Sequence, residues 1–168
     1  MGSMKPILAL AAVLLAVAAA VSAPVPARAG GTIRLTSTAE VEVTRVDEEG
    51  RTAVERVPAA KVVPGEVVLY TNRYENVGEQ PAENVVITNP VPEHMTYVAG
   101  SAFGEGTRIT FSVDGGARFD LPENLTVIGP DGRPRPASAE EYTHVRWARS
   151  RPVEPGETGA VGFRARLN

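Results

Sequence analysis

The two histidines are the side chains with the clearest capacity for chemistry, since an imidazole can act as a base or a metal ligand near neutral pH. His94 and His144 lie far apart in the sequence, and neither has a histidine or cysteine at the spacing of a metal site. The chain has no cysteine and no Gly-x-Ser-x-Gly segment. We therefore expect no catalytic residue, no bound cofactor and no enzyme activity. A hydrolase would need a histidine or carboxylate pair in a cleft.

Carboxylates are the second candidates, because Ca²⁺ takes about six to eight oxygen ligands. Asp47-Glu48-Glu49 and Asp114 could supply such oxygens. No Asp-x-Asp-x-Asp-Gly series accompanies them, and acidic residues are also common in solvated turns. We predict turns here and no metal site.

Aromatic and basic side chains offer two further possibilities. A platform for stacking on a sugar ring would draw on Trp147, Tyr142, Tyr97 and Tyr74. A docking spot for an acidic partner would draw on Arg146, Arg149 and Arg151. Strand alternation places Trp147 on the same face as Val145, which favours a core tryptophan between two sheets. For the arginines we favour a solvated strand edge.

The first 29 residues have the features of a secretory signal peptide. Lys5 precedes an apolar run from Ile7 to Val21, which is shorter than the roughly 20 residues that a membrane span needs. The exit Ala27-Arg28-Ala29 predicts cleavage after Ala29, because an earlier cut after Ala23 would place a proline directly behind it. We expect an exported protein, periplasmic or extracellular, with no membrane span after cleavage.

Residues 30–168 should form a single domain. About 139 residues remain after cleavage, enough for one hydrophobic core. They carry 15 basic and 20 acidic side chains, a formal charge near −5. This balance argues against a nucleic-acid partner. Without cysteine, stability must come from packing alone.

Strand periodicity runs through most of this domain and predicts an all-β fold. Short alternating runs are bounded by Gly, Pro, Asn and Asp, and we count eight or nine strands of an antiparallel sandwich. The stretch 64–102 reads as two paired strands with their turns. In the first of them Val68, Tyr70, Asn72 and Tyr74 share the face that we assign to the core. Residues 118–141 read as a long surface loop with a short strand around Leu125 to Ile128.

The motifs of residues 64–102 resemble a known family. The stretch has a Pro-Gly turn, a tyrosine-bearing strand, Asn-x-Gly, Ala-x-Asn-Val-x-Ile-x-Asn-x-Val-Pro and Met-x-Tyr-Val-x-Gly-Ser-Ala. It resembles the conserved repeat domain called domain of unknown function 11, and residues 143–163 look like the end of the same unit. The resemblance implies an immunoglobulin-like antiparallel β-sandwich in a bacterial or archaeal exported protein. Asn72 departs from it, because the family usually has an apolar residue there; either Asn72 lies at a sheet edge, or the face assigned to the core is wrong.

Two functions follow as expectations. The first is a non-enzymatic structural or adhesive module of the cell envelope or surface, which binds protein partners or itself through strand edges. In that scheme residues 30–46 would be a donor strand. The alternative is a carbohydrate- or ligand-binding accessory domain; a fully buried Trp147 would count against it.

Overall fold

The computed structural model describes residues 32–46 and 50–168, so the expected signal peptide and the turn residues Asp47 to Glu49 lie outside the described part. The described residues form an all-β fold of eleven strands, all paired antiparallel, with two short 3₁₀ turns. The strands are β1 (Ile33–Val46), β2 (Thr52–Pro58), β3 (Val67–Asn76), β4 (Val86–Pro90), β5 (Met95–Tyr97), β6 (Phe103–Gly104), β7 (Thr107–Ser112), β8 (Thr126–Ile128), β9 (Pro134–Pro136), β10 (His144–Arg149) and β11 (Thr158–Leu167). The 3₁₀ turns are η1 (Pro122–Asn124) and η2 (Ala139–Glu141). No helix in this part is long and apolar enough to cross a membrane.

The described residues form two strands more than the upper number of nine that the sequence predicts. β6 has only two residues and pairs with β11, while β9 consists of Pro134, Arg135 and Pro136 and pairs with β8. Prolines argue against a strand because they lack the N–H that a ladder uses. β9 tolerates them because it is an edge strand of a two-stranded sheet.

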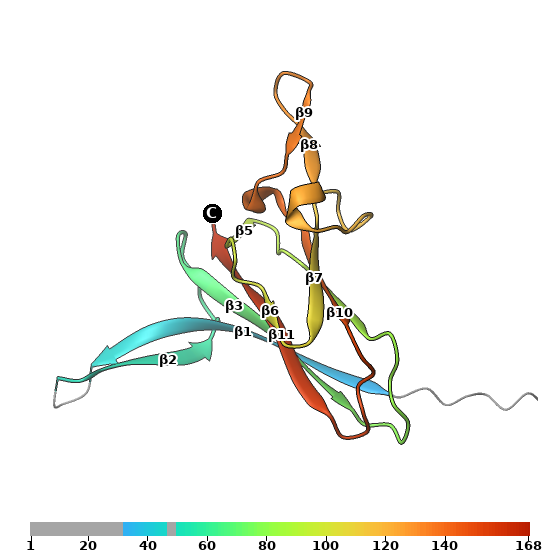
Figure 1. Cartoon of the computed structure of the whole chain (residues 1–168). Helices are drawn as coiled ribbons and strands as arrows, with labels where there is room; N and C mark the ends of the chain where they lie inside the picture. The colour runs from blue at the N-terminus through green and yellow to red at the C-terminus, as the bar shows by residue number, and fades with distance from the viewer. Residues whose placement is uncertain (1–31, 47–49) are drawn as a thin grey trace, which may run out of the picture.

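Two sheets pack face to face (Figure 1). The large sheet has the order β2-β1-β3-β11-β5, with β6 also paired to β11, and the small sheet has the order β4-β10-β7. The sequence prediction that β3 and β4 pair with each other is therefore wrong, because they belong to different sheets. The Asn76 side chain holds the crossing between them: its Nδ2 donates to the carbonyls of Gln80 and Val153, and its Oδ1 accepts from the Gly78 N–H.

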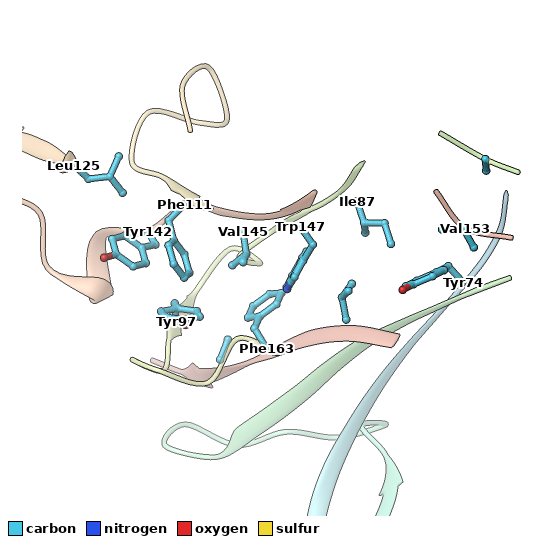
Figure 2. Close-up of a cluster of buried hydrophobic side chains, with 13 residues drawn as sticks. Tyr74, Ile87, Tyr97, Phe111, Leu125, Tyr142, Val145, Trp147, Val153 and Phe163 are labelled. Carbon is cyan, nitrogen blue, oxygen red and sulfur yellow. The ribbon is translucent and has the colours of Figure 1, made fainter. Parts of the chain in front are cut away.

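The core lies between the sheets and is built by the alternation that the sequence predicts (Figure 2). Val145 and Trp147 of the small sheet are 0% and 1% exposed, and Val161 and Phe163 of the large sheet are both 0% exposed. Trp147 stacks on Phe163 with ring centroids 6.3 Å apart. At one end of the core the rings of Tyr97, Phe111 and Tyr142 lie together, the last two stacked at 4.5 Å. The assignment of the tyrosine face of β3 to the core is confirmed.

Asn72 is the exception on that face. The sequence left two explanations for it, a sheet edge or a wrong face, and both are wrong: β3 is paired on both sides, and Asn72 is 0% exposed on the core face. Its Oδ1 accepts a hydrogen bond of 2.6 Å from Ser37 Oγ of β1. Its Nδ2 has no partner, and neither does the Trp147 Nε1 of the facing sheet.

Two Pro-Gly-Glu turns close opposite ends of the β3–β11 pair. Before β3 the Glu66 carboxylate accepts from the Val63 N–H, and before β11 the Glu157 carboxylate accepts from the Glu154 N–H, each at 2.9 Å. Gly65 N–H donates to the Leu167 carbonyl at the end of β11. In the same way Gly156 N–H donates to the Asn76 carbonyl at the end of β3. The segments Pro64-Gly65-Glu66 and Pro155-Gly156-Glu157 therefore make the same set of turn contacts.

The β1–β2 hairpin extends past the body of the molecule (Figure 1). β1 pairs with β3 only from Ile33 to Val41, and with β2 from Glu40 to Val46. The remaining residues of the two strands form a two-stranded ribbon. Val46 and Val54 on this ribbon are 64% and 66% exposed.

Candidate functional site

The two histidines lie in separate settings. The backbone of His94 is left-handed at φ 62°, its side chain is exposed, and its carbonyl accepts from the Asn168 N–H. His144 is half-buried beside Thr143, with its ring edge-on to Phe119 and the two ring centroids 6.3 Å apart. Neither imidazole is hydrogen-bonded to a described carboxylate. The contacts of the two histidines therefore do not assemble a base and its orienting partner.

Asp114 stabilises a turn. Its Oδ1 accepts hydrogen bonds from Ser112 Oγ at 2.7 Å and from the N–H groups of Ala117 and Arg118 at 3.1 and 3.0 Å. The bond from Arg118 contributes most to a pKa below the ordinary value of an aspartate. Over residues 32–46 and 50–168 no three His, Cys, Asp or Glu side chains cluster as metal ligands would. The acidic run 47–49 lies outside this range.

The four aromatic side chains proposed for sugar stacking are core residues. Trp147, Tyr97, Tyr74 and Tyr142 are between 1% and 7% exposed, as the alternation of Trp147 with Val145 predicts. A stacking platform built on Trp147 is therefore wrong, because a buried indole presents no face to solvent. A hollow of about 390 Å³ does open at the edge of this aromatic core, where Ala99, Pro122 and Ala139 complete its lining.

The three arginines that are close in sequence do not form one basic patch. Arg146 lies on the solvent face of β10, with its guanidinium 3.5 Å from the Phe119 ring centroid. The Arg149 side chain is 6% exposed and binds Glu157 Oε1 at 2.6 Å and the Glu105 carbonyl at 3.2 Å. Arg149 therefore joins the end of β10 to two turns. A docking spot shared by these arginines is wrong, and so is the solvated strand edge that the sequence favours, because β10 is the central strand of the small sheet and the Arg149 side chain is buried.

The free edge of β2 is the feature that the sequence reasoning missed. Residues 30–46 were expected to be the strand available to a partner. In the described part of this segment, residues 33–41 pair with β3 on one edge and residues 40–46 pair with β2 on the other, so the strand already belongs to the large sheet of its own chain. The last strand of the large sheet on this side is β2, and none of the described strands pairs with its outer edge. The spacing of Val54, Arg56 and Pro58 could have shown an edge strand, since proline is confined to edges.

Both charged side chains of β2 are held by its neighbour β1. Glu55 forms an ion pair with Arg45, and Arg56 Nε lies 3.2 Å from Glu42 Oε1. Glu42 also accepts from Arg164 Nη2 of β11 at 2.8 Å, and this bond contributes most to a pKa below the usual range of a glutamate. Both charged side chains of β2 are therefore bound to residues of β1.

Comparison with known proteins gives no further guide. No family model, curated protein or solved structure matches this chain. The resemblance to the conserved repeat domain stays a prediction from the motifs of residues 64–102 and 143–163.

Proposed function

We propose that this protein is a non-enzymatic structural or adhesive module of a bacterial cell envelope or surface, exported by its signal peptide and folded as an immunoglobulin-like sandwich. The observation that carries the proposal is the β1–β2 hairpin, a ribbon that extends past the core and whose outer edge is unpaired among the described strands. Exposed strand edges are templates for another chain. The candidate acidic and basic residues support structure instead: Asp114 caps a turn and Arg149 is bound to Glu157.

Expression of the full chain in a bacterium tests the export and binding parts together. We expect a product that starts at Gly30, as measured by mass spectrometry, and that is recovered outside the cytoplasm. We also expect this product to bind isolated envelopes of the native host saturably and to retain specific envelope proteins in a pull-down. An uncleaved product confined to the cytoplasm, or a product that binds no envelope component, would overturn the proposal.

A ligand-binding function is the second candidate, and the hollow beside Tyr97 and Tyr142 favours it. Its lining is mostly apolar and its volume of about 390 Å³ lies within the range of small-molecule sites. Such a site would bind an apolar or aromatic group. Ala139 lines the hollow, so Ala139→Trp should fill it.

A fluorescence-based screen of small aromatic and glycan probes checks this second function. Binding by the wild type that is lost in A139W, but kept in A160W on the opposite side of the large sheet, would support it. Equal binding by both variants would show that the hollow is not used.

A further inference from the structure

We propose that β2 pairs antiparallel with β2 of a second copy of this chain, centred on Val54, so that two hairpins form a four-stranded sheet. The inference rests on the proposed function in one respect, since it names the partner of the edge described above. The hydrogen-bond alternation, the charges and the exposed valines of the ribbon carry it.

The alternation of the β1–β2 ladder decides which backbone groups are free. Ala59 N–H donates to the Ala39 carbonyl at 2.9 Å, and in an antiparallel ladder every second residue bonds to the same neighbour. The odd-numbered residues of β2 therefore bond to β1. Thr52, Val54 and Arg56 direct their N–H and C=O groups to the free edge. Pro58 offers neither group there, because it has no N–H and its carbonyl accepts from the Ala60 N–H at 2.8 Å.

A protected edge usually carries unpaired charges or a bulge that discourages pairing. Pro58 protects only the end of β2. Its charged side chains Glu55 and Arg56 are already paired with Arg45 and Glu42 of the same hairpin. The middle of the edge is therefore open to another strand.

The sequence of β2 selects one register for self-pairing. A twofold axis through the sheet must pass between two identical residues, because opposite residues share a face. Centring on Glu55 or Arg56 would place like charges directly opposite each other, which is destabilising. Centring on Ala53 would overlap only Thr52 to Val54 of each strand. Centring on Val54 overlaps Thr52 to Arg56 and places valine against valine.

This register also covers the exposed valines. Val46 pairs with Thr52, and Thr44 with Val54, so Val46 and Val54 lie on the same face of the ribbon. They are 64% and 66% exposed. In the paired hairpins the two Val54 side chains meet at the axis, with Val46 of each copy beside them. A two-stranded ribbon is marginally stable in water, and four strands with an apolar stripe are more stable.

The interface is isologous, so it closes after two copies. Both copies use the same edge of β2, so none of the β2 edge is left for a third copy. We therefore expect a dimer and no filament through β2. Because the contact is one strand edge with a small stripe, the dimer should depend on protein concentration.

Sedimentation of the full chain, with any N-terminal processing that the host performs, tests the dimer over a wide concentration range. We expect a monomer–dimer equilibrium that Val54→Pro and Val54→Lys both shift to monomer by at least about tenfold. V54P removes an N–H that β1 does not use, and V54K places two positive charges at the axis. V54A and T38K are controls, the latter adding the same charge on β1 away from the edge. Circular dichroism checks that each variant folds. If V54P does not fold, the monomer–dimer equilibrium of V54K tests the proposal by itself.

Cross-linking tests the register, and the absence of native cysteine makes single-cysteine variants clean. In an antiparallel hydrogen-bonded pair the two Val54 Cα atoms would lie about 5.5 Å apart, within disulfide range. V54C should form a disulfide dimer on oxidation, and R56C and V46C should not. A monomeric wild type at all concentrations, a V54K protein that dimerises as the wild type does, or a R56C dimer without a V54C dimer would overturn the proposal.

The envelope assay separates this inference from the proposed function. A monomeric wild type that still binds envelopes would end the dimer and leave the module function standing. A V54C dimer from a protein that binds no envelope would do the reverse.

Discussion

Ser37 Oγ lies 2.6 Å from Asn72 Oδ1, a hydrogen bond that joins β1 to a fully buried polar side chain on the core face of β3. Ser37 itself is exposed, so the buried amide obtains its partner from the rim of the sheet. The other half of that amide, Nδ2, is buried without a partner. The core thus holds a polar group that is only half satisfied.

Replacing Asn72 by Leu should stabilise the protein. The buried Nδ2 without a partner destabilises the wild type by about 1–3 kcal/mol, and N72L removes this cost. The variant also loses the hydrogen bond from Ser37, worth about 0.5–1.5 kcal/mol, but the exposed Ser37 hydroxyl can bond to water instead. We expect a gain of about 1 kcal/mol in the free energy of unfolding, measured by urea titration. Asn72→Asp should instead lose at least about 2 kcal/mol, because it buries a carboxylate. A large loss in N72L would show that the amide is needed as it stands.

Gly162→Ala should be strongly destabilising. A Cβ at this position would meet the Tyr70 carbonyl at 2.4 Å and the Phe103 ring at 2.6 Å. The carbonyl is backbone in the adjacent strand and cannot rotate away, so we expect a loss of about 2–3 kcal/mol in thermal or urea unfolding. Adding Phe103→Ala should restore little of it. Full rescue by F103A would mean that the ring, and not the carbonyl, sets the limit.

Gly65→Ala and Gly156→Ala should have matching effects. Both glycines have positive φ, 93° and 76°, and a methyl group added at either would meet no atom within 4 Å, so only backbone strain changes. Each alanine should lower stability by about 1–2 kcal/mol. Because the two turns are distant and alike, the double variant should lose the sum. Unequal costs in chemical denaturation would show that the turns differ in strain.

Acid should destabilise the segment around η2. Arg135 Nη1 and Nη2 bind both Glu141 oxygens at 2.7 and 2.6 Å, and Ser138 N–H adds a third bond, which lowers the pKa of Glu141 from 4.5 to about 2. A lowered folded-state pKa gives stability that is complete above pH 4.5 and is lost as the pH falls toward 2.

The melting temperature of the wild type should therefore fall between pH 5 and pH 2 more steeply than that of Glu141→Gln. Added salt should reduce the difference, because the ion pair is exposed and is screened. Parallel pH curves for the two proteins would show that this carboxylate does not couple to folding.

Replacing Arg149 by Met should test the junction at the end of β10. The side chain is 6% exposed and its loss would leave the Glu105 carbonyl and the second Pro-Gly-Glu turn without their cation. We expect a loss of about 2–3 kcal/mol in urea unfolding. Arg146→Met, on the solvent face, is the matched control and should change stability little. Similar effects of the two would contradict the role of burial.

Alternation along single strands was enough to predict the faces of this fold. Trp147 with Val145, and Phe163 with Val161, are core pairs because a strand places every second side chain on one side. The alternation does not say which strand lies next to which. β3 and β4 follow each other in sequence but pair with β11 and β10, strands more than 50 residues away.

The neighbours of the first strand could not be predicted for the same reason. Residues 30–46 look free in the sequence because they are near the start of the domain, yet residues 33–46 pair with β2 and β3 of the same chain. The partner of Asn72 was also beyond prediction, since its hydrogen bond depends on Ser37 being directly opposite in another strand. Local pattern predicts which side chains are buried, and long-range pairing decides what they meet.

The pairing of β3 with β11 has a consequence for the time course of folding. Residues 67–75 must meet residues 158–166, so the large sheet cannot close until residue 166 has left the ribosome. Contacts of such long sequence separation are reached slowly, on the scale of about milliseconds to seconds. While the chain is being synthesised, β3 therefore has to wait for its β11 partner, and the core face of β3 stays uncovered on that side until then.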